Sequence, residues 1–150
     1  MKKLLVLVIA LMLTAGAYAQ IEAPVKWGYG AKRISATEAV VFLKATIQPG
    51  WHIYSLHVKK GGPIATSFTF APSKDYMLTG KTIEPKPASK YEKSFYMNVT
   101  YFEKEVVFQQ KIKLKSANAI TVKGKLEYEV CNNQKCLPPE EVSFNIPVAK

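Results

Sequence analysis

Two cysteines, Cys131 and Cys136, are the residues of this chain whose type and spacing could do redox chemistry. They bracket four residues, 132–135, between a strand-like segment and the run Leu137-Pro138-Pro139. Residues that flank the loop of an antiparallel hairpin can bring their Cα atoms within the roughly 5.5 Å that a disulfide requires. In an oxidising compartment such a pair is normally oxidised at rest. The spacing therefore predicts a disulfide.

The predicted bridge has two interpretations, a structural cross-link or a redox-active pair. Closing a ring of about six residues removes on the order of 2 kcal/mol of unfolded-state entropy, against about 5 kcal/mol for a ring of about 100. A bridge that served stability alone would do better between distant strands. Short-loop bridges in accessible turns are also attacked more readily by a thiolate, and the adjacent Lys135 favours the thiolate of Cys136. We favour a redox-active pair, with an inert structural disulfide as the alternative.

The first 19 residues indicate that the protein is exported to an oxidising compartment. Lys2 and Lys3 precede the apolar run Leu4 to Leu13, and Ala17-Tyr18-Ala19 follows as a cleavage site. This is the pattern of a secretory signal peptide, and the apolar run is shorter than the roughly 20 residues that span a bilayer. We expect a signal peptide at 1–19, a single domain at 20–150, a periplasmic location and no membrane span.

The charge is strongly positive, +10 for the whole chain. Such a balance suits nucleic acid, an acidic partner or an anionic surface. Export argues against nucleic acid. The lysines are spread along the chain and alternate with apolar residues, which favours a solvated basic face.

A zinc site is a further alternative, because His52 and His57 have the same spacing as the two cysteines. Together the four side chains could form a tetrahedral centre. However, residues five apart on a strand point to opposite faces, and thiols of an exported protein tend to pair with each other. We expect no metal and no organic cofactor.

The elements that position the cysteines are predicted to be strands. In Ile120 to Val130 apolar residues alternate with Thr, Lys and Glu, as in a strand with one buried face. Further strands are predicted at 38–47, 51–56, 66–70, 76–83, 106–114 and 142–148. Short strands with turn residues between them indicate an all-β fold, an immunoglobulin-like antiparallel β-sandwich.

The segment Glu84 to Ser94 is predicted to be one long surface loop, since it has two prolines and few apolar residues. Phe95 and Tyr96 follow it directly. An aromatic ring at this place could cover a reactive sulfur until a partner displaces it.

Three segments resemble the N-terminal periplasmic domain of the thiol:disulfide interchange protein DsbD. The most specific runs from Tyr128 through both cysteines to Cys136-Leu137-Pro138-Pro139-Glu140. Ile47 to Tyr54 resembles that domain's early aromatic strand, and Ser94-Phe95-Tyr96 resembles its cap loop. The resemblance implies an immunoglobulin-like fold and a relay of electrons from a membrane reductase to periplasmic thiol–disulfide proteins.

Carried over, the resemblance implies roles for single residues. Cys136 would be the attacking thiolate, Cys131 the resolving thiol, Phe95 the cap and Tyr54 a wall of the same pocket. Lys93-Ser94 stand where the family has acids before the cap. We expect thioredoxin-like periplasmic partners and a membrane thiol reductase acting in trans. The alternatives are a redox-inert binding module and an envelope scaffold.

Overall fold

The computed structural model describes residues 22–150, which contain eleven antiparallel strands joined by turns and loops. The expected signal peptide at 1–19 lies outside the described residues. The strands are β1 (Val25–Arg33), β2 (Glu38–Ile47), β3 (His52–Tyr54), β4 (Ser67–Phe70), β5 (Tyr76–Ile83), β6 (Ala88–Glu92), β7 (Met97–Phe102), β8 (Glu105–Leu114), β9 (Ile120–Tyr128), β10 (Val130–Cys131) and β11 (Glu140–Val148). The described residues contain no helix of the length and apolarity that a membrane crossing requires.

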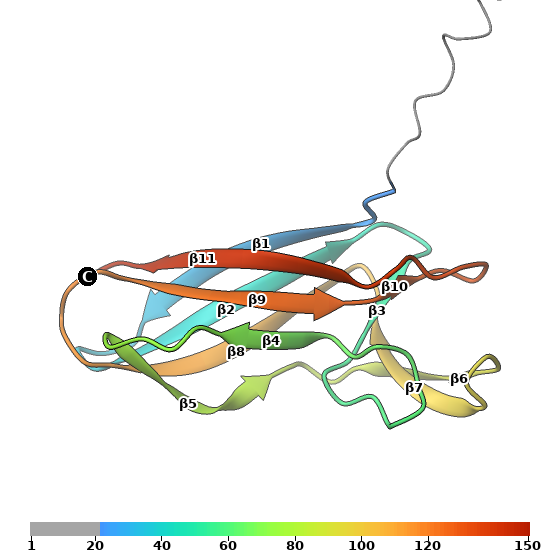
Figure 1. Ribbon diagram of the computed structural model, residues 1–150, viewed down its shortest axis with the longest axis horizontal. Helices are drawn as coiled ribbons and strands as arrows, with labels where there is room; N and C mark the ends of the chain where they lie inside the picture. Colours follow the sequence, from blue (N-terminus) through green and yellow to red (C-terminus); the bar gives the residue numbers. More distant parts are fainter. Residues whose placement is uncertain (1–21) are drawn as a thin grey trace, which may run out of the picture.

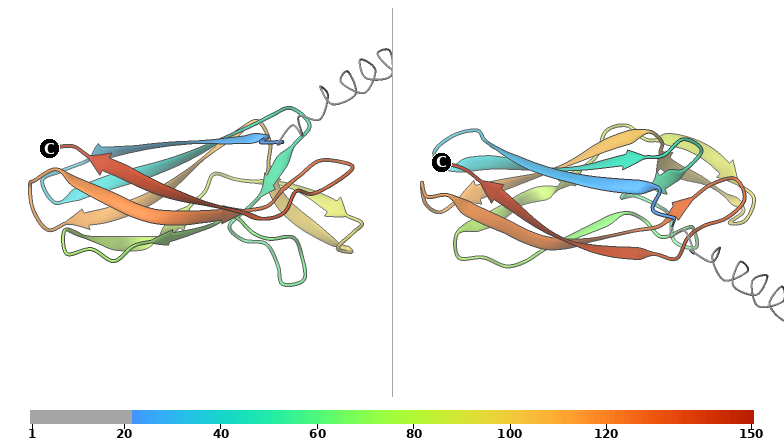
Figure 2. Two further views of the ribbon diagram at one scale, coloured as in Figure 1. Left: turned by 45° about the horizontal axis from the view of Figure 1, so that its top comes forward. Right: turned by 90° about the horizontal axis from the view of Figure 1, so that it is seen from above.

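The strands form three sheets. One has the order β1-β2-β8-β5, the second β11-β9-β4 and the third β10-β3-β7-β6. The first two sheets run along the length of the molecule as two layers, and the short third sheet lies at the end away from the C-terminus (Figures 1 and 2). This arrangement confirms the predicted all-β, immunoglobulin-like antiparallel sandwich.

The core lies between the two long layers and follows the predicted alternation. On β9, Val122, Leu126 and Tyr128 are buried while Thr121 and Lys123 are exposed. Phe108 of β8 lies in the same core. Its ring packs tilted against Phe68 and edge-to-face against Phe102. Because each long strand turns one set of alternate side chains inward, the sequence pattern was sufficient to predict this part of the fold.

Three features of the strand pattern differ from the prediction. Ala88 to Glu92, expected within a long loop, form β6 and pair with β7. β1 was not predicted. Both are edge strands. The side chains of β6 are largely exposed, so this strand lacks the alternation of a half-buried strand. β1 does turn Val25, Trp27 and Ala31 toward the core, but its two glycines weaken the strand signal in the sequence. The predicted strand 120–130 also divides, because the chain leaves the β11-β9-β4 sheet after Tyr128 and pairs with β3 from Val130 onward.

Gly124 is required where the centre of β9 meets its neighbours. It lies opposite Phe144 on β11 and Phe70 on β4. A Cβ atom at this position would collide with the backbone oxygen of Thr69 and with the ring of Phe144.

We therefore predict that Gly124→Ala lowers the free energy of unfolding by about 2 kcal/mol, because a well-packed core resists added volume. Urea denaturation followed by circular dichroism measures the change. Gly28→Ala on β1 is the matched control, since no atom lies within 4 Å of its added Cβ. Equal stabilities of the two variants would contradict the prediction.

Candidate functional site

The two cysteines form a disulfide at the end of the sandwich that carries the third sheet. The Cys131 and Cys136 sulfurs are 2.02 Å apart, and the Cα atoms are 4.0 Å apart. Cys131 ends β10 and lies opposite His52 of β3, and the chain then folds back so that Cys136 forms a single antiparallel bridge with Cys131. The hairpin geometry predicted from the spacing is therefore confirmed.

Asn132 organises the four-residue loop between the cysteines. Its side-chain Oδ1 accepts hydrogen bonds from the backbone N–H groups of Gln134 and Lys135, each at 2.8 Å. Its own N–H donates to the Lys135 carbonyl at 2.8 Å. An asparagine side chain that bonds the backbone two residues further on closes its own turn in this way. The disulfide thus sits at the base of a preformed turn.

The two sulfurs differ in their access to solvent. Cys131 is 2% exposed and packs with Tyr54 and Val99. Cys136 is exposed. An incoming nucleophile therefore reaches the bridge from the Cys136 side.

A cleft of about 320 Å³ opens beside the disulfide. Its walls come from β3, β6, the turn after β6 and the cysteine loop, and its lining residues are Tyr54, Lys90, Glu92, Ser94, Phe95, Cys131, Asn132, Asn133, Gln134, Lys135 and Cys136. Of the residues predicted for the site, both cysteines, Phe95 and Tyr54 are brought together here. Tyr96 is not among the lining residues. It lies at the end of the β6–β7 turn, 84% exposed, with a left-handed φ of 53°.

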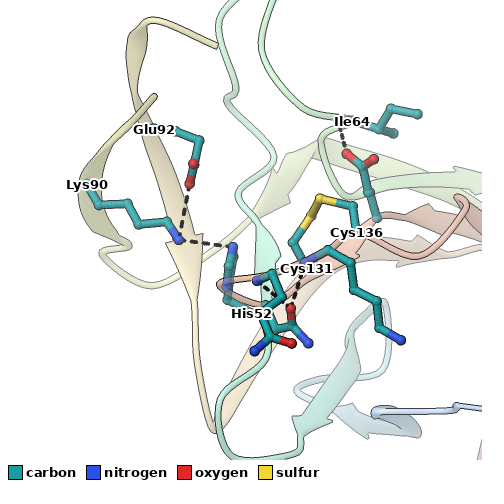
Figure 3. Close-up of a disulfide and its surroundings, with 10 residues drawn as sticks. His52, Ile64, Lys90, Glu92, Cys131 and Cys136 are labelled. Carbon is teal, nitrogen blue, oxygen red and sulfur yellow. Dashed lines mark hydrogen bonds and ion pairs between the residues drawn. A yellow bond between two sulfur atoms is a disulfide. The ribbon is translucent and has the colours of Figure 1, made fainter. Parts of the chain in front are cut away.

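A buried histidine with a charged partner lies beneath the cleft. His52 is 3% exposed, and its Nε2 lies 3.2 Å from the Lys90 ammonium. Lys90 also contacts the Glu92 carboxylate at 3.3 Å (Figure 3). Its ammonium lies 5.0 Å above the centre of the Tyr101 ring. Burial, reinforced by the Lys90 charge and opposed by Glu92, lowers the pKa of His52 to about 4. The imidazole is therefore neutral at pH 7 and accepts a hydrogen bond from Lys90.

The alternative zinc site is not formed. His52 is engaged with Lys90, and His57 is exposed. In the described part of the chain, the side chains close enough to share a metal ion are Glu129, Cys131 and Cys136, whose ligand atoms lie within 4.8 Å of one another. The two sulfurs are bonded to each other, so the oxidised protein offers no thiolate ligand there.

Glu129 was missed as a site residue, because the alternation of the predicted strand assigned it to the solvated face. The Ile64 N–H donates to its carboxylate at 2.9 Å. The sequence did hold one signal for Glu129: it lies two residues before Cys131. Side chains two residues apart on an extended chain point to the same side. Tyr54 faces the same charge: burial raises its pKa, and the Glu92 and Glu129 carboxylates raise it further.

The fold and the site together define a class: immunoglobulin-like sandwich domains with a disulfide at one end, one sulfur buried and the other open to a cleft. The family model described as "Thiol:disulfide interchange protein DsbD, N-terminal" matches residues 22–147, and the chain belongs to this family. The membership and the cysteine pair support thiol–disulfide interchange. No curated protein matches the chain.

Solved structures give the same fold. The DsbD N-terminal domain of Neisseria meningitidis in its reduced form has a TM-score of 0.54 at 17% identity, covering 83% of this chain and 86% of that one. The same domain in complex with the PilB N-terminal domain has a TM-score of 0.54 at 16% identity, covering 84% of this chain and 87% of that one. The N-terminal periplasmic domain of ScsB from Proteus mirabilis has a TM-score of 0.54 at 24% identity, covering 81% of this chain but only 44% of that one.

The pH dependence of stability is expected to report on His52. Its pKa is lowered from the ordinary 6.5 to about 4 in the folded protein, so between these values the unfolded chain binds a proton that the folded chain excludes. Stability is then fully present above pH 6.5 and falls as the pH drops toward 4, by on the order of 3 kcal/mol. The groups that face this imidazole are Lys90, Glu92, Tyr54 and Tyr101.

We predict that His52→Gln removes most of this loss between pH 6.5 and 4, measured as the free energy of unfolding in urea at each pH. His57→Gln, at an exposed position, is the control and keeps the wild-type slope. A His52→Gln profile parallel to wild type would show that other groups cause the loss.

Proposed function

We propose that this protein is a periplasmic thiol–disulfide interchange protein that relays electrons through the Cys131–Cys136 pair. The observation that carries the proposal is the asymmetry of the bridge, with Cys136 open to the cleft and Cys131 buried behind it. In the reduced form, the Cys136 thiolate attacks a partner's disulfide and forms a mixed disulfide. The Cys131 thiol then resolves it, which leaves the 131–136 bond and the reduced partner.

Thioredoxin-like proteins are the proposed partners, and a membrane thiol reductase is the proposed source of electrons. Family membership supports both, and the solved complex of a Neisseria domain of this fold with a second protein domain supports docking of a partner domain. The signal-peptide pattern at 1–19 supports periplasmic export. The exposed Tyr96 and the polar rim of the cleft, with Ser94, Asn133 and Gln134, provide a surface on which a partner can dock around Cys136.

Trapping the mixed disulfide tests the proposal. Reduced Cys131→Ala protein mixed with an oxidised thioredoxin-like protein is expected to form a covalent adduct through Cys136, because the resolving thiol is gone. Non-reducing electrophoresis and mass spectrometry detect it. Cys136→Ala is the matched control and should give at least about tenfold less adduct, since its remaining sulfur is buried. Equal adduct yields from the two variants would refute the assignment of Cys136 as the attacking residue.

Phe95 is proposed as a cap over the pair and Tyr54 as a wall of the same pocket. Phe95 is half-buried, lies in the turn between β6 and β7, and lines the cleft with both cysteines. A ring at this position hinders a thiolate that approaches the bridge.

Phe95→Ala is therefore expected to speed reduction of the disulfide by dithiothreitol severalfold, measured by stopped-flow tryptophan fluorescence or quenched thiol counting. Tyr96→Ala, next in the chain but outside the cleft lining, should react at the wild-type rate. A Phe95→Ala rate that matches wild type would remove the cap role while leaving the cysteine roles intact.

An inert structural disulfide is the second candidate, favoured by the packing of Cys131 against Tyr54 and Val99. The reduction potential decides between them. A value below about −300 mV resists biological reductants and would assign the bridge to the structural class, whereas an interchange protein requires a higher value.

A further inference from the structure

A carboxylate lies beside the disulfide at the point where the chain passes from β9 to β10. One oxygen of Glu129 and the two cysteine sulfurs all lie within 4.8 Å of one another. The Ile64 N–H donates to this carboxylate at 2.9 Å and fixes its position; the dashed line from Ile64 in Figure 3 marks this bond. Glu129 is half-buried, so its charge is only partly screened by solvent.

The two lysines that line the cleft form ion pairs with carboxylates other than Glu129. Lys90 contacts His52 and Glu92, and Lys135 forms an ion pair with Glu22 at 2.5 Å. Among the described residues, Glu129 makes no salt bridge of its own. It therefore faces the sulfurs as a carboxylate without a neutralising partner.

Resolution of a mixed disulfide poses a proton problem at Cys131. Its thiol must become a thiolate before it can attack, yet the side chain is 2% exposed, and burial disfavours the charged form. Bulk water has poor access to this proton. A base that reaches Cys131 directly or through one water molecule would solve the problem.

We propose that Glu129 is the general base of the resolving step. This inference rests on the interchange function proposed above. After Cys136 has formed a mixed disulfide with a partner sulfur, the Glu129 carboxylate takes the proton of the Cys131 thiol. The Cys131 thiolate attacks the Cys136 sulfur, the bond from Cys136 to the partner breaks, and the partner leaves as a thiolate that takes up a proton. Two electrons pass from the cysteine pair to the partner. In reverse, protonated Glu129 returns the proton to the departing Cys131.

The experiment separates the two sulfur steps with dithiobis(nitrobenzoate), an aromatic disulfide whose released thiolate absorbs visible light. Reduced protein mixed with an excess of this probe releases one thiolate when Cys136 attacks and a second when Cys131 resolves the adduct. Stopped-flow absorbance resolves the two phases. Glu129→Gln keeps an oxygen that can accept the Ile64 N–H but cannot accept the thiol proton.

Glu129→Gln is expected to slow the second phase by about 100-fold at pH 7, the usual scale for loss of a general base, without slowing the first. A purely electrostatic role predicts the opposite sign, because removal of a nearby negative charge favours both thiolates and speeds both phases. Glu127→Gln, an exposed position two residues earlier on β9, is the matched control and leaves both phases unchanged.

The pH profile gives a second measure of the same step. At high pH, where hydroxide deprotonates Cys131 unaided, Glu129→Gln and wild type should converge. The other titratable groups facing the pair are Tyr54, Lys90, Glu92 and Lys135 from the cleft walls, and they are unchanged in both proteins. A thermal melt shows whether the variant is folded.

The outcomes distinguish the two proposals. If wild type releases no thiolate in either phase, the interchange function itself fails. If wild type shows both phases and Glu129→Gln resolves at the wild-type rate or faster, the role of Glu129 fails alone. A second phase slowed equally at every pH in a variant with a lowered melting temperature would indicate a structural effect and overturn the proposal.

Discussion

The pairing of Cys131 with His52 is the constraint on which the geometry of the site depends. Only two residues, Val130 and Cys131, form β10, yet they fix the cysteine against β3. One sulfur is thereby buried beside Tyr54, and the turn that follows returns the other to the surface. The disulfide bridges only the ends of one turn, so it adds little to the stability of the sandwich, on the order of 2 kcal/mol. The core of β2, β8, β9 and β11 stabilises the fold without it.

The charged and polar side chains around the disulfide are positioned by hydrogen bonds and ion pairs. Lys90 contacts three neighbours, the His52 imidazole, the Glu92 carboxylate and the face of the Tyr101 ring. Burial, reinforced by the Lys90 charge, lowers the pKa of His52 and keeps the imidazole neutral. Glu129 is anchored by the Ile64 N–H instead and stays free of a cation among the described residues. The disulfide therefore lies between a compensated charge cluster and an uncompensated carboxylate. This arrangement lets the two sulfurs differ in their chemistry as well as in their exposure.

The carboxylate beside the two sulfurs comes from a different segment of the chain than the family resemblance implied. Lys93 and Ser94 precede Phe95 in the turn where the resemblance implied acids, and the carboxylate beside the two sulfurs is that of Glu129. A change of sheet makes this possible. Had the β9 strand continued unbroken, the alternation would have turned Glu129 toward solvent with Glu127. At the crossing from β9 to β10, its side chain lies instead beside the cysteine pair.

The sequence by itself determined the sandwich class, the long strands and the disulfide, because period-two alternation and a hairpin-length spacing are local properties. It also pointed to Phe95 beside the sulfurs, through the resemblance. The tertiary structure alone decided that Ala88 to Glu92 form an edge strand, that Lys90 reaches His52, and that Glu129 joins the site. Each of these depends on which segments meet at the third sheet. The contact of Lys90 with His52 links residues far apart in the chain, so no local pattern encodes it. The edge strand and the place of Glu129 depend instead on the short strands β7 and β10, which pair with β3 only in the folded chain.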